Sequence, residues 1–373
     1  MARRTLIWHL GLAQSSRPVV GTSLAAHREA LEAGGLRLVA SETEARLATY
    51  EILRTHRDAA LSRADVEGQW ARICDRVWAH KGVSVLSTPD LCVADKVQLR
   101  LALDPLIGVE VHLVVTAEPL GAQLYGAWLA ELRAGRSTGW EKYAARVLDH
   151  LDGVAEQHPQ GERFRAGHDL PAVLARWGWT VRADRVHVVV AADPVAQWAG
   201  FLDVLSLGVV SDEVQGLPDL PALVPAYADP AGVAVLRRVN RQVDAEVAPE
   251  SRGLLLGSHS PADDETDDAR GMPAVDTLPL RPLLEKWAVD LAATGIDVRG
   301  DLPALASGPV GAGLPGRGDQ LAVAVDALGD ALGENTRLRA EVASLRADNE
   351  RLDRKRRKLK RRMSSLSAVA EEN

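Results

Sequence analysis

The chain has 373 residues, of which 46% are hydrophobic, so it is long enough to bury one large core or two modest ones. Its two cysteines, Cys74 and Cys92, form no C-x-x-C pair, which argues against a zinc site and a disulfide framework. The formal net charge is -7, but residues 321–373 hold 12 basic and 9 acidic residues, which leaves -10 on residues 1–320. Basic charge is therefore concentrated toward one end of the chain.

The first residues enter a short apolar run directly, and no stretch approaches about 18 uninterrupted apolar residues. We therefore expect a cytoplasmic protein without a transmembrane segment. No cluster of metal-ligating residues has the spacing of a known metal site, so no metal is expected.

The first predicted strand covers residues 6–11 and stops at Gly11. A small-residue turn and a helix from about Thr22 follow it. In α/β proteins this arrangement presents backbone N–H groups to a phosphate at the start of the helix. The turn has no lysine and no Gly-Lys-Ser/Thr ending, so it predicts an architecture more firmly than it predicts phosphate binding.

Further strands are predicted at residues 83–87, 109–116 and 186–190, of which the second is rich in β-branched residues. A helix at residues 24–33 precedes a short strand, and apolar spacings of three and four predict two helices within residues 44–80. Strands separated by helices favour parallel pairing through right-handed crossovers. The sequence therefore predicts a three-layer α/β domain with a parallel sheet.

Three stretches share their spacing with one protein family: residues 9–11, 117–128 and 169–187. The matching positions are His9, Gly11, Ala117, Gln123, Trp128, Asp169, Arg176, Trp177, Arg185, Val186 and His187. In these stretches the chain resembles the sulfotransferase-like proteins of GC-rich actinobacteria, over roughly residues 4–305. The resemblance implies a P-loop-type fold over residues 1–305 and a site for 3'-phosphoadenosine 5'-phosphosulfate.

The resemblance places the 5'-phosphosulfate side of the donor at Gly11, Gln14, Ser15, Ser16 and Arg17. The family's lysine is replaced by Gln14, its glycine by Ser16, and the last two threonines of its loop by Arg17 and the proline after it. The loop is therefore a degenerate form of the family's donor loop.

The resemblance places the 3'-phosphate of the donor at Glu118 and Gly126, where the family has arginine and serine. A carboxylate in place of a phosphate-binding guanidinium reverses the charge of the site. The family's base follows the strand at residues 83–87. Here that corner ends in Pro89 and Asp90, which makes Asp90 a weak candidate base.

These substitutions favour a sulfotransferase-like protein with lost or weakened donor binding that acts as a dimeric binding or assembly module. No cofactor is expected in that case. The alternative is an active sulfotransferase, in which Arg17 replaces the lysine, Asp90 is the base, and 3'-phosphoadenosine 5'-phosphosulfate donates a sulfuryl group to a hydroxyl acceptor.

Two stretches without apolar periodicity interrupt the later part of the chain. Residues 249–276 are acidic and predict a mobile loop, because they offer too little apolar surface to offset the entropy of ordering. Residues 306–320 are rich in glycine and proline and predict a flexible linker.

Residues 321–366 predict a coiled coil, because two sets of positions each repeat every seven residues from residue 328 to residue 366. One set is Leu328, Asn335, Val342, Asn349, Arg356 and Met363, and the other is Ala331, Leu338, Leu345, Leu352, Leu359 and Leu366. Asparagine at two positions of the first set and leucine in the second favour a parallel homodimer. A single amphipathic helix that folds back on the domain remains the alternative.

The end of the predicted coiled coil, residues 354–362, holds eight Lys or Arg residues, and residues 367–373 form a tail. Like charges across a dimer oppose pairing there. One interpretation is an adaptor that contacts nucleic acid or an anionic surface. The other is a solvated basic helix end, which the helix dipole favours.

Overall fold

The computed structural model of this protein describes residues 4–15, 18–153, 158–206, 228, 230–242, 272–308 and 316–371. These residues form two compact units, Met1–Gly316 and Arg317–Asn373, which we describe separately. None of the described helices is long and apolar enough to cross a membrane.

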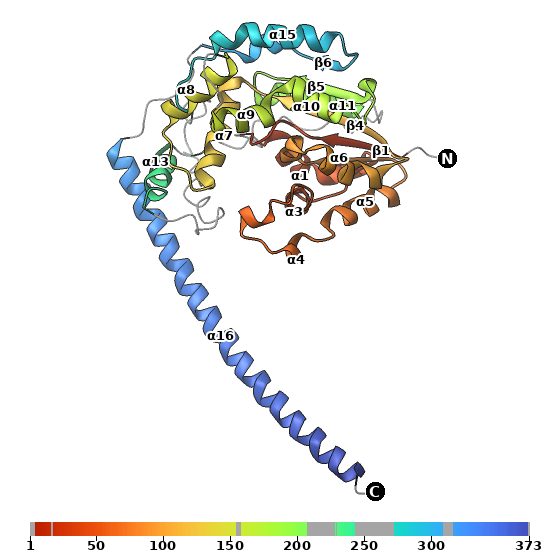
Figure 1. Ribbon diagram of the computed structural model, residues 1–373, viewed down its shortest axis with the longest axis vertical. Helices are drawn as coiled ribbons and strands as arrows, with labels where there is room; N and C mark the ends of the chain where they lie inside the picture. Colours follow the sequence, from red (N-terminus) through yellow and green to blue (C-terminus); the bar gives the residue numbers. More distant parts are fainter. Residues whose placement is uncertain are drawn as a thin grey trace. The chain divides into compact units, whose positions relative to one another are not determined.

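A six-stranded, all-parallel sheet is the centre of the first unit (Figure 1). Its strands, in spatial order, are β2 (Leu36–Leu38), β3 (Val83–Ser87), β1 (Thr5–His9), β4 (Glu110–Ala117), β5 (Val186–Val190) and β6 (Asp297–Arg299). Every pair of neighbouring strands is parallel. The prediction of an α/β domain with a parallel sheet is therefore confirmed.

The strand order reverses between β1 and β4. From β1 the chain crosses to β2 on one side of the sheet, and from β4 it continues to β5 and β6 on the other side. In open α/β sheets such a reversal leaves a crevice at the carboxyl ends of the two strands, where ligands bind. The loop after β1 and the residues after β4 meet this edge.

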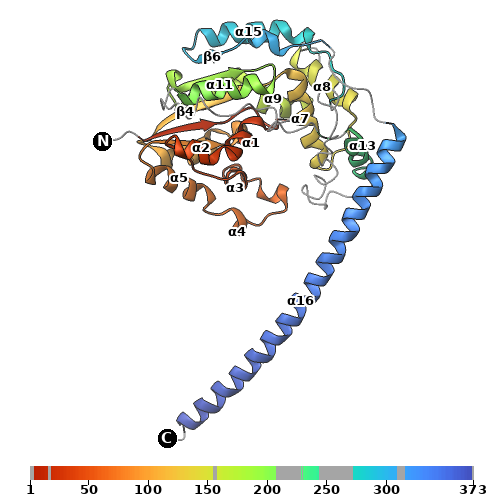
Figure 2. The same ribbon diagram turned by 180° about the vertical axis from the view of Figure 1, so that it is seen from behind.

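Helices cover both faces of the sheet (Figures 1 and 2). One layer contains α1 (Val19–Ala26), α2 (Arg28–Ala33) and α11 (Pro194–Ser206), and the other contains α3 (Glu42–Leu53), α5 (Gln69–Ala79), α6 (Lys96–Leu103), α10 (Leu170–Trp177) and α15 (Arg281–Ala292). Alternate residues of β1 serve the two layers: Ile7 packs with the first, whereas Leu6 and Trp8 pack with the second.

A third apolar cluster joins helices that lie beyond the carboxyl end of β4. They are α7 (Leu120–Arg133), α8 (Trp140–Leu151), α9 (Pro159–His168) and α13 (Pro230–Val239). Helix α7 follows β4 directly and is buried from Leu120 to Leu129. Its first turn therefore lies at the same edge of the sheet as the loop after β1.

Several predicted elements differ in detail from the structure. The predicted helix at residues 24–33 is two helices, because α1 ends at Ala26 and α2 begins after His27, whose ring stacks on Trp198. The predicted helix pair at residues 44–80 is α3 and α5, with the 3-10 helix η1 (His56–Ala59) and α4 (Arg63–Val66) between them. The predicted strand at residues 83–87 has the same bounds as β3.

Two further predictions concern residues that the structure describes only in part. Of the predicted acidic loop, residues 249–271 lie outside the described residues, as do residues 309–315 of the predicted linker. The second unit is one helix of 55 residues, α16 (Arg317–Glu371). Its large apolar side chains between Val325 and Leu359 are exposed within the described chain.

Candidate functional site

The loop between β1 and α1 begins at Gly11, a residue whose backbone conformation favours glycine. Gly11 has φ +58, and a Cβ atom there would lie 3.1 Å from Cβ of Pro89 and 3.3 Å from Nε2 of His9. Glycine adopts this backbone conformation most freely, and a side chain at this point would be tight against Pro89 and His9. Further along, the N–H of Ala13 donates to the carbonyl of Gly167 over 3.4 Å, which ties the loop to the end of α9.

His9, the last residue of β1, links three neighbouring strands. Its Nδ1 lies 2.8 Å from Oγ of Ser87 at the end of β3, and its Nε2 lies 3.0 Å from Oγ1 of Thr116 in β4. Burial lowers the pKa of His9 to about 3, so the ring is neutral at physiological pH. Since both nitrogens are hydrogen-bonded inside the protein, His9 supports the loop rather than acting on a ligand.

The carboxylate of Asp90 accepts a hydrogen bond from the backbone of this loop. Asp90 lies in the 3-10 helix η2 (Pro89–Val93) after β3, and its Oδ1 accepts the backbone N–H of Gln14 at 3.0 Å. Asp90 remains exposed, yet partial desolvation by the surrounding protein raises its pKa, against the opposing effects of Gln14 and Arg133. The structure thus brings together two of the predicted site residues.

Arg133 is a site residue that the sequence analysis missed. It ends α7, and its guanidinium interacts electrostatically with Asp90 and Tyr125, while desolvation lowers its pKa. It belongs to no motif, and only the fold carries the end of α7 toward η2. Asp90 and Arg133 therefore bring a carboxylate and a guanidinium to the candidate site.

A hydrogen-bonded chain holds the segment after β4. The side-chain Nε2 of Gln123 donates to the carbonyl of Glu118 at 2.6 Å, so its Oε1 must accept from Nδ1–H of His168, 3.1 Å away. Burial lowers the pKa of His168 to about 3, and its ring is therefore neutral. These two hydrogen bonds fix the backbone at Glu118 and connect it to α9.

The remaining predicted site residues are dispersed. Ser15 lies in the loop after β1, and Glu118 follows β4 at the same edge of the sheet. Gly126 lies nearly two turns inside α7 and is buried. Ser16 and Arg17 lie outside the described residues.

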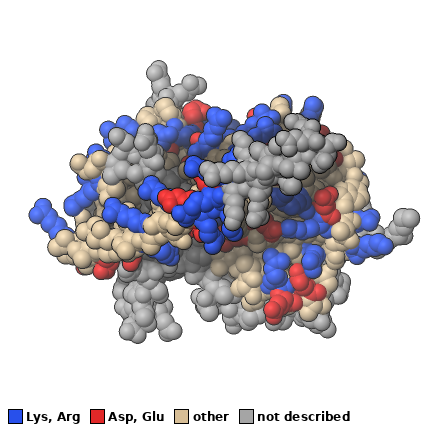
Figure 3. Space-filling view, turned by 90° about the horizontal axis from the view of Figure 1, so that it is seen from below, with Lys and Arg blue, Asp and Glu red and all other residues tan. Residues whose placement is uncertain are grey.

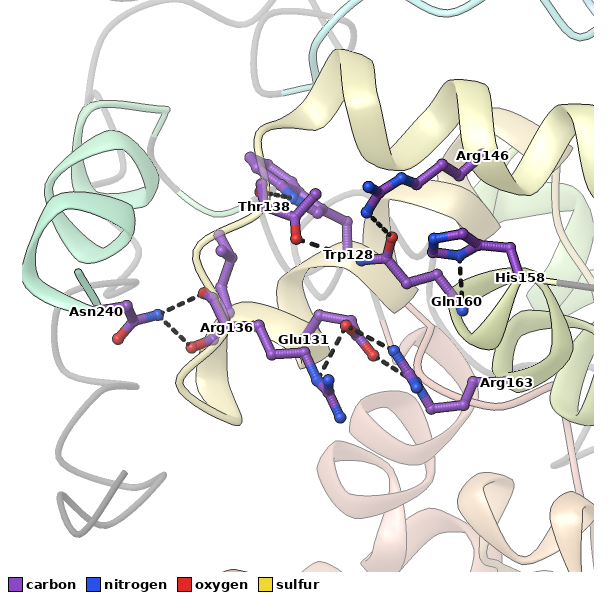
Figure 4. A network of polar contacts seen from close by, with 10 residues as sticks. Trp128, Glu131, Arg136, Thr138, Arg146, His158, Gln160, Arg163 and Asn240 are labelled. Atoms are coloured by element: carbon purple, nitrogen blue, oxygen red, sulfur yellow. Dashed lines mark hydrogen bonds and ion pairs between the residues drawn. The ribbon is translucent and has the colours of Figure 1, made fainter. Parts of the chain in front are cut away.

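A polar network fixes the end of α7 that carries Arg133 (Figure 4). The carboxylate of Glu131 accepts two hydrogen bonds from Arg163, at 2.8 and 3.1 Å, and pairs with Arg136 at 3.0 Å. Nearby, Nδ2 of Asn240 donates to the carbonyls of Leu132 and Arg136 at 2.7 and 2.9 Å. These bonds hold α7, α9 and α13 together and so position the edge of the site.

A second polar cluster lies at the opposite, amino end of the sheet. Nδ1 of His112 lies 3.1 Å from Nε2 of His187, and Nδ1 of His187 lies 2.9 Å from Oδ2 of Asp297. Glu110 and Arg299 flank this chain of side chains. His187, one of the positions that match the sulfotransferase-like family, is therefore a hydrogen-bonded strand residue away from the candidate site.

The described residues contain no group of three or more His, Cys, Asp or Glu side chains that could hold a metal ion. On the face seen in Figure 3, Lys and Arg side chains lie among Asp and Glu side chains and uncharged surface. Among the described residues of the site, Asp90 and Glu118 supply carboxylates and Arg133 supplies a guanidinium. Comparisons of the chain with protein-family models, with curated proteins and with solved structures found no match.

Proposed function

We propose that this protein is a dimeric binding or assembly module, built on a P-loop-type, sulfotransferase-like domain that has lost or weakened binding of the sulfuryl donor. The central place of β1 in a parallel sheet, with its loop at the point of strand reversal, supports this type of domain. The exposed apolar positions of α16 support a parallel, two-stranded coiled coil.

The hydrogen bond from the N–H of Gln14 to Asp90 carries the proposal. Backbone N–H groups of a loop between a strand and a helix bind phosphate when they are free to point at it. Here the protein's own carboxylate accepts one of them, and it would repel a phosphate at short range. An anion must displace Asp90 before it can use this donor.

Two further substitutions act in the same direction. Glu118 stands where the family has an arginine, and Gly126 offers no hydroxyl where the family has a serine. Each preorganised donor that is lost typically costs about 2.7–4 kcal/mol of transition-state stabilisation. Losses at separate phosphate positions leave little donor binding and little catalysis.

Titration calorimetry with 3'-phosphoadenosine 5'-phosphate tests the proposal. We expect a dissociation constant above about 1 mM for the parent protein. The combined change Gln14→Lys, Glu118→Arg and Gly126→Ser should tighten binding by at least about tenfold, because it restores the family's phosphate contacts. Asp90→Asn is the matched single variant, since it removes the competing charge at nearly constant shape. Micromolar binding by the parent protein would contradict the proposal.

One observation favours the second candidate function, an active sulfotransferase. Desolvation raises the pKa of Asp90, which brings this carboxylate closer to the range of a general base. An active enzyme would transfer a sulfuryl group from 3'-phosphoadenosine 5'-phosphosulfate to a hydroxyl acceptor, and Asp90→Asn would lower its rate by about 100-fold or more. If the protein is an active sulfotransferase, Asp90→Asn reduces its turnover. If it is a binding module, neither the parent protein nor the Asp90→Asn variant turns over the donor.

A further inference from the structure

Helix α6 exposes two large apolar side chains beside two cations. Val97 and Leu101 lie one helical turn apart and keep 64% and 44% of their surface exposed. Lys96 and Arg100 are also one turn apart, on the adjoining side of α6, and both are exposed. The other side of α6 is buried in the core through Leu99. The exposed side is therefore held rigidly in place.

The indole of Trp179, just after α10, extends this surface. It is 58% exposed, and its ring centroid lies 5.8 Å from Nζ of Lys96 and 5.4 Å from Cζ of Arg100. These cation–π contacts hold the ring next to α6. Tryptophan and arginine are enriched among the residues that dominate binding energy at protein interfaces. We call Lys96, Val97, Arg100, Leu101 and Trp179 the α6 surface.

The cations of the α6 surface are not neutralised by a carboxylate within the part of the chain that the structure describes. The neighbouring carboxylate of Asp95 caps the helix, since it accepts the N–H groups of Val97 and Gln98 at 2.8 and 2.9 Å. The surface is thus apolar and basic, although residues 1–320 carry a formal charge of -10. That body charge disfavours extended anionic polymers and anionic membranes, but it leaves a short acidic segment free to bind locally.

We infer that the α6 surface binds an amphipathic helix of a partner protein whose apolar side is bordered by carboxylates. Apolar anchors at helical spacing match the pair formed by Val97 and Leu101, and the bordering carboxylates match Lys96 and Arg100, which contact the indole of Trp179. Helix α6 follows η2, which carries Asp90, in the sequence. The inference rests on the proposed role as a binding protein, but it depends neither on donor binding nor on α16.

Fluorescence anisotropy of labelled peptides with the full-length protein tests the inference. The probes are a designed amphipathic helix with a leucine stripe and flanking glutamates, the same helix with lysines in place of the glutamates, and a scrambled form of the acidic peptide. We expect the acidic helix to bind at least about tenfold more tightly than either of the other two. Equal affinity for the acidic and the basic helix would overturn the inference.

Substitutions then locate the binding site. Val97→Ser with Leu101→Ser should weaken binding of the acidic helix at least about tenfold, whereas Val289→Ser, at a 71% exposed position of α15, should leave it unchanged. Lys96→Glu with Arg100→Glu should reverse the preference toward the basic helix. All of these side chains are exposed, and a parallel unfolding curve confirms that each variant is folded. Unchanged binding in both α6 variants would overturn the inference, whatever the nucleotide titration shows.

Discussion

The two units of this protein differ in whether their apolar side chains are buried. In the first unit Trp8 is fully buried, stacked on Trp70 with ring centroids 5.1 Å apart and met edge-on by Trp177 at 5.2 Å. In α16 the leucines of the predicted seam are exposed, and Leu345 keeps 55% of its surface in contact with solvent. The apolar side chains of the first unit are thus buried within that unit, whereas those of α16 would be buried by the second helix of the proposed coiled coil.

The largest expected effect follows from removing the centre of the first unit. Trp8→Ala should lower the free energy of unfolding by about 3–5 kcal/mol, because it opens a cavity between β1 and α5. It also leaves Oγ1 of Thr88 without the indole N–H that donates to it at 2.7 Å. Chemical denaturation followed by circular dichroism measures the change.

The matched control for Trp8→Ala is Trp179→Ala. Trp179 is exposed, so its loss should change the free energy of unfolding by less than about 0.5 kcal/mol. Equal effects of the two substitutions would show that the core is not centred on Trp8. Neither substitution should alter association through α16.

The next effect concerns α16. Leu345→Ala should weaken self-association by about 2–5 kcal/mol, since leucine at this position would be buried in the proposed dimer. Light scattering over a dilution series should show a dimer for the parent protein and a monomer for a chain that ends at Gly318. Ser344→Ala, outside the two sets of seam positions, is the control and should leave the dimer intact. A monomeric full-length protein would refute the dimer.

The smallest expected effect, counted per pH unit, is a pH dependence of the stability of the first unit. Burial holds the pKa of His9 and of His168 at about 3, below the ordinary 6.5, so the unfolded chain binds more protons between these values. Stability from each histidine is therefore complete above about pH 6.5 and falls by about 1.4 kcal/mol per pH unit as the pH drops toward 3.

Denaturation midpoints at pH 7, 6 and 5 (about two pH units in all) measure this slope. His9→Gln and His168→Gln should each remove one histidine's share of it, although both variants lose native hydrogen bonds. A slope that is the same in the parent protein and in both variants would contradict the assignment. Association through α16 should not follow this pH dependence.

Much of the first unit could be predicted because its local pattern and its tertiary role agree. The short run Val-Ser-Val-Leu-Ser at residues 83–87 is buried on both faces of a parallel sheet, and the predicted bounds of the strand coincide with those of β3. The break at His27 could not be predicted, because it accompanies a stacking contact with Trp198, which lies far away in the sequence. Apolar periodicity alone continues through residue 27.

The candidate site was less predictable than the fold. Asp90 was identified from its position after a strand, but its hydrogen bond to Gln14 joins residues 76 positions apart and leaves no trace in either segment. Arg133 carries no motif, and its relation to Asp90 arises from the packing of α7. Sequence patterns report the backbone path, whereas the electrostatics of a site depend on which distant side chains meet there.

The two outer strands of the sheet bear on self-association. Both β2 and β6 are only three residues long, and each carries charge: Arg37 pairs with Glu32 at 3.6 Å, and Arg299 pairs with Asp297 at 2.9 Å. Short, charged edges make poor templates for adding a strand from another chain. A coiled coil would raise the local concentration of the first unit to about the millimolar range. Edges of this kind let the protein tolerate such crowding without joining its sheets into an aggregate.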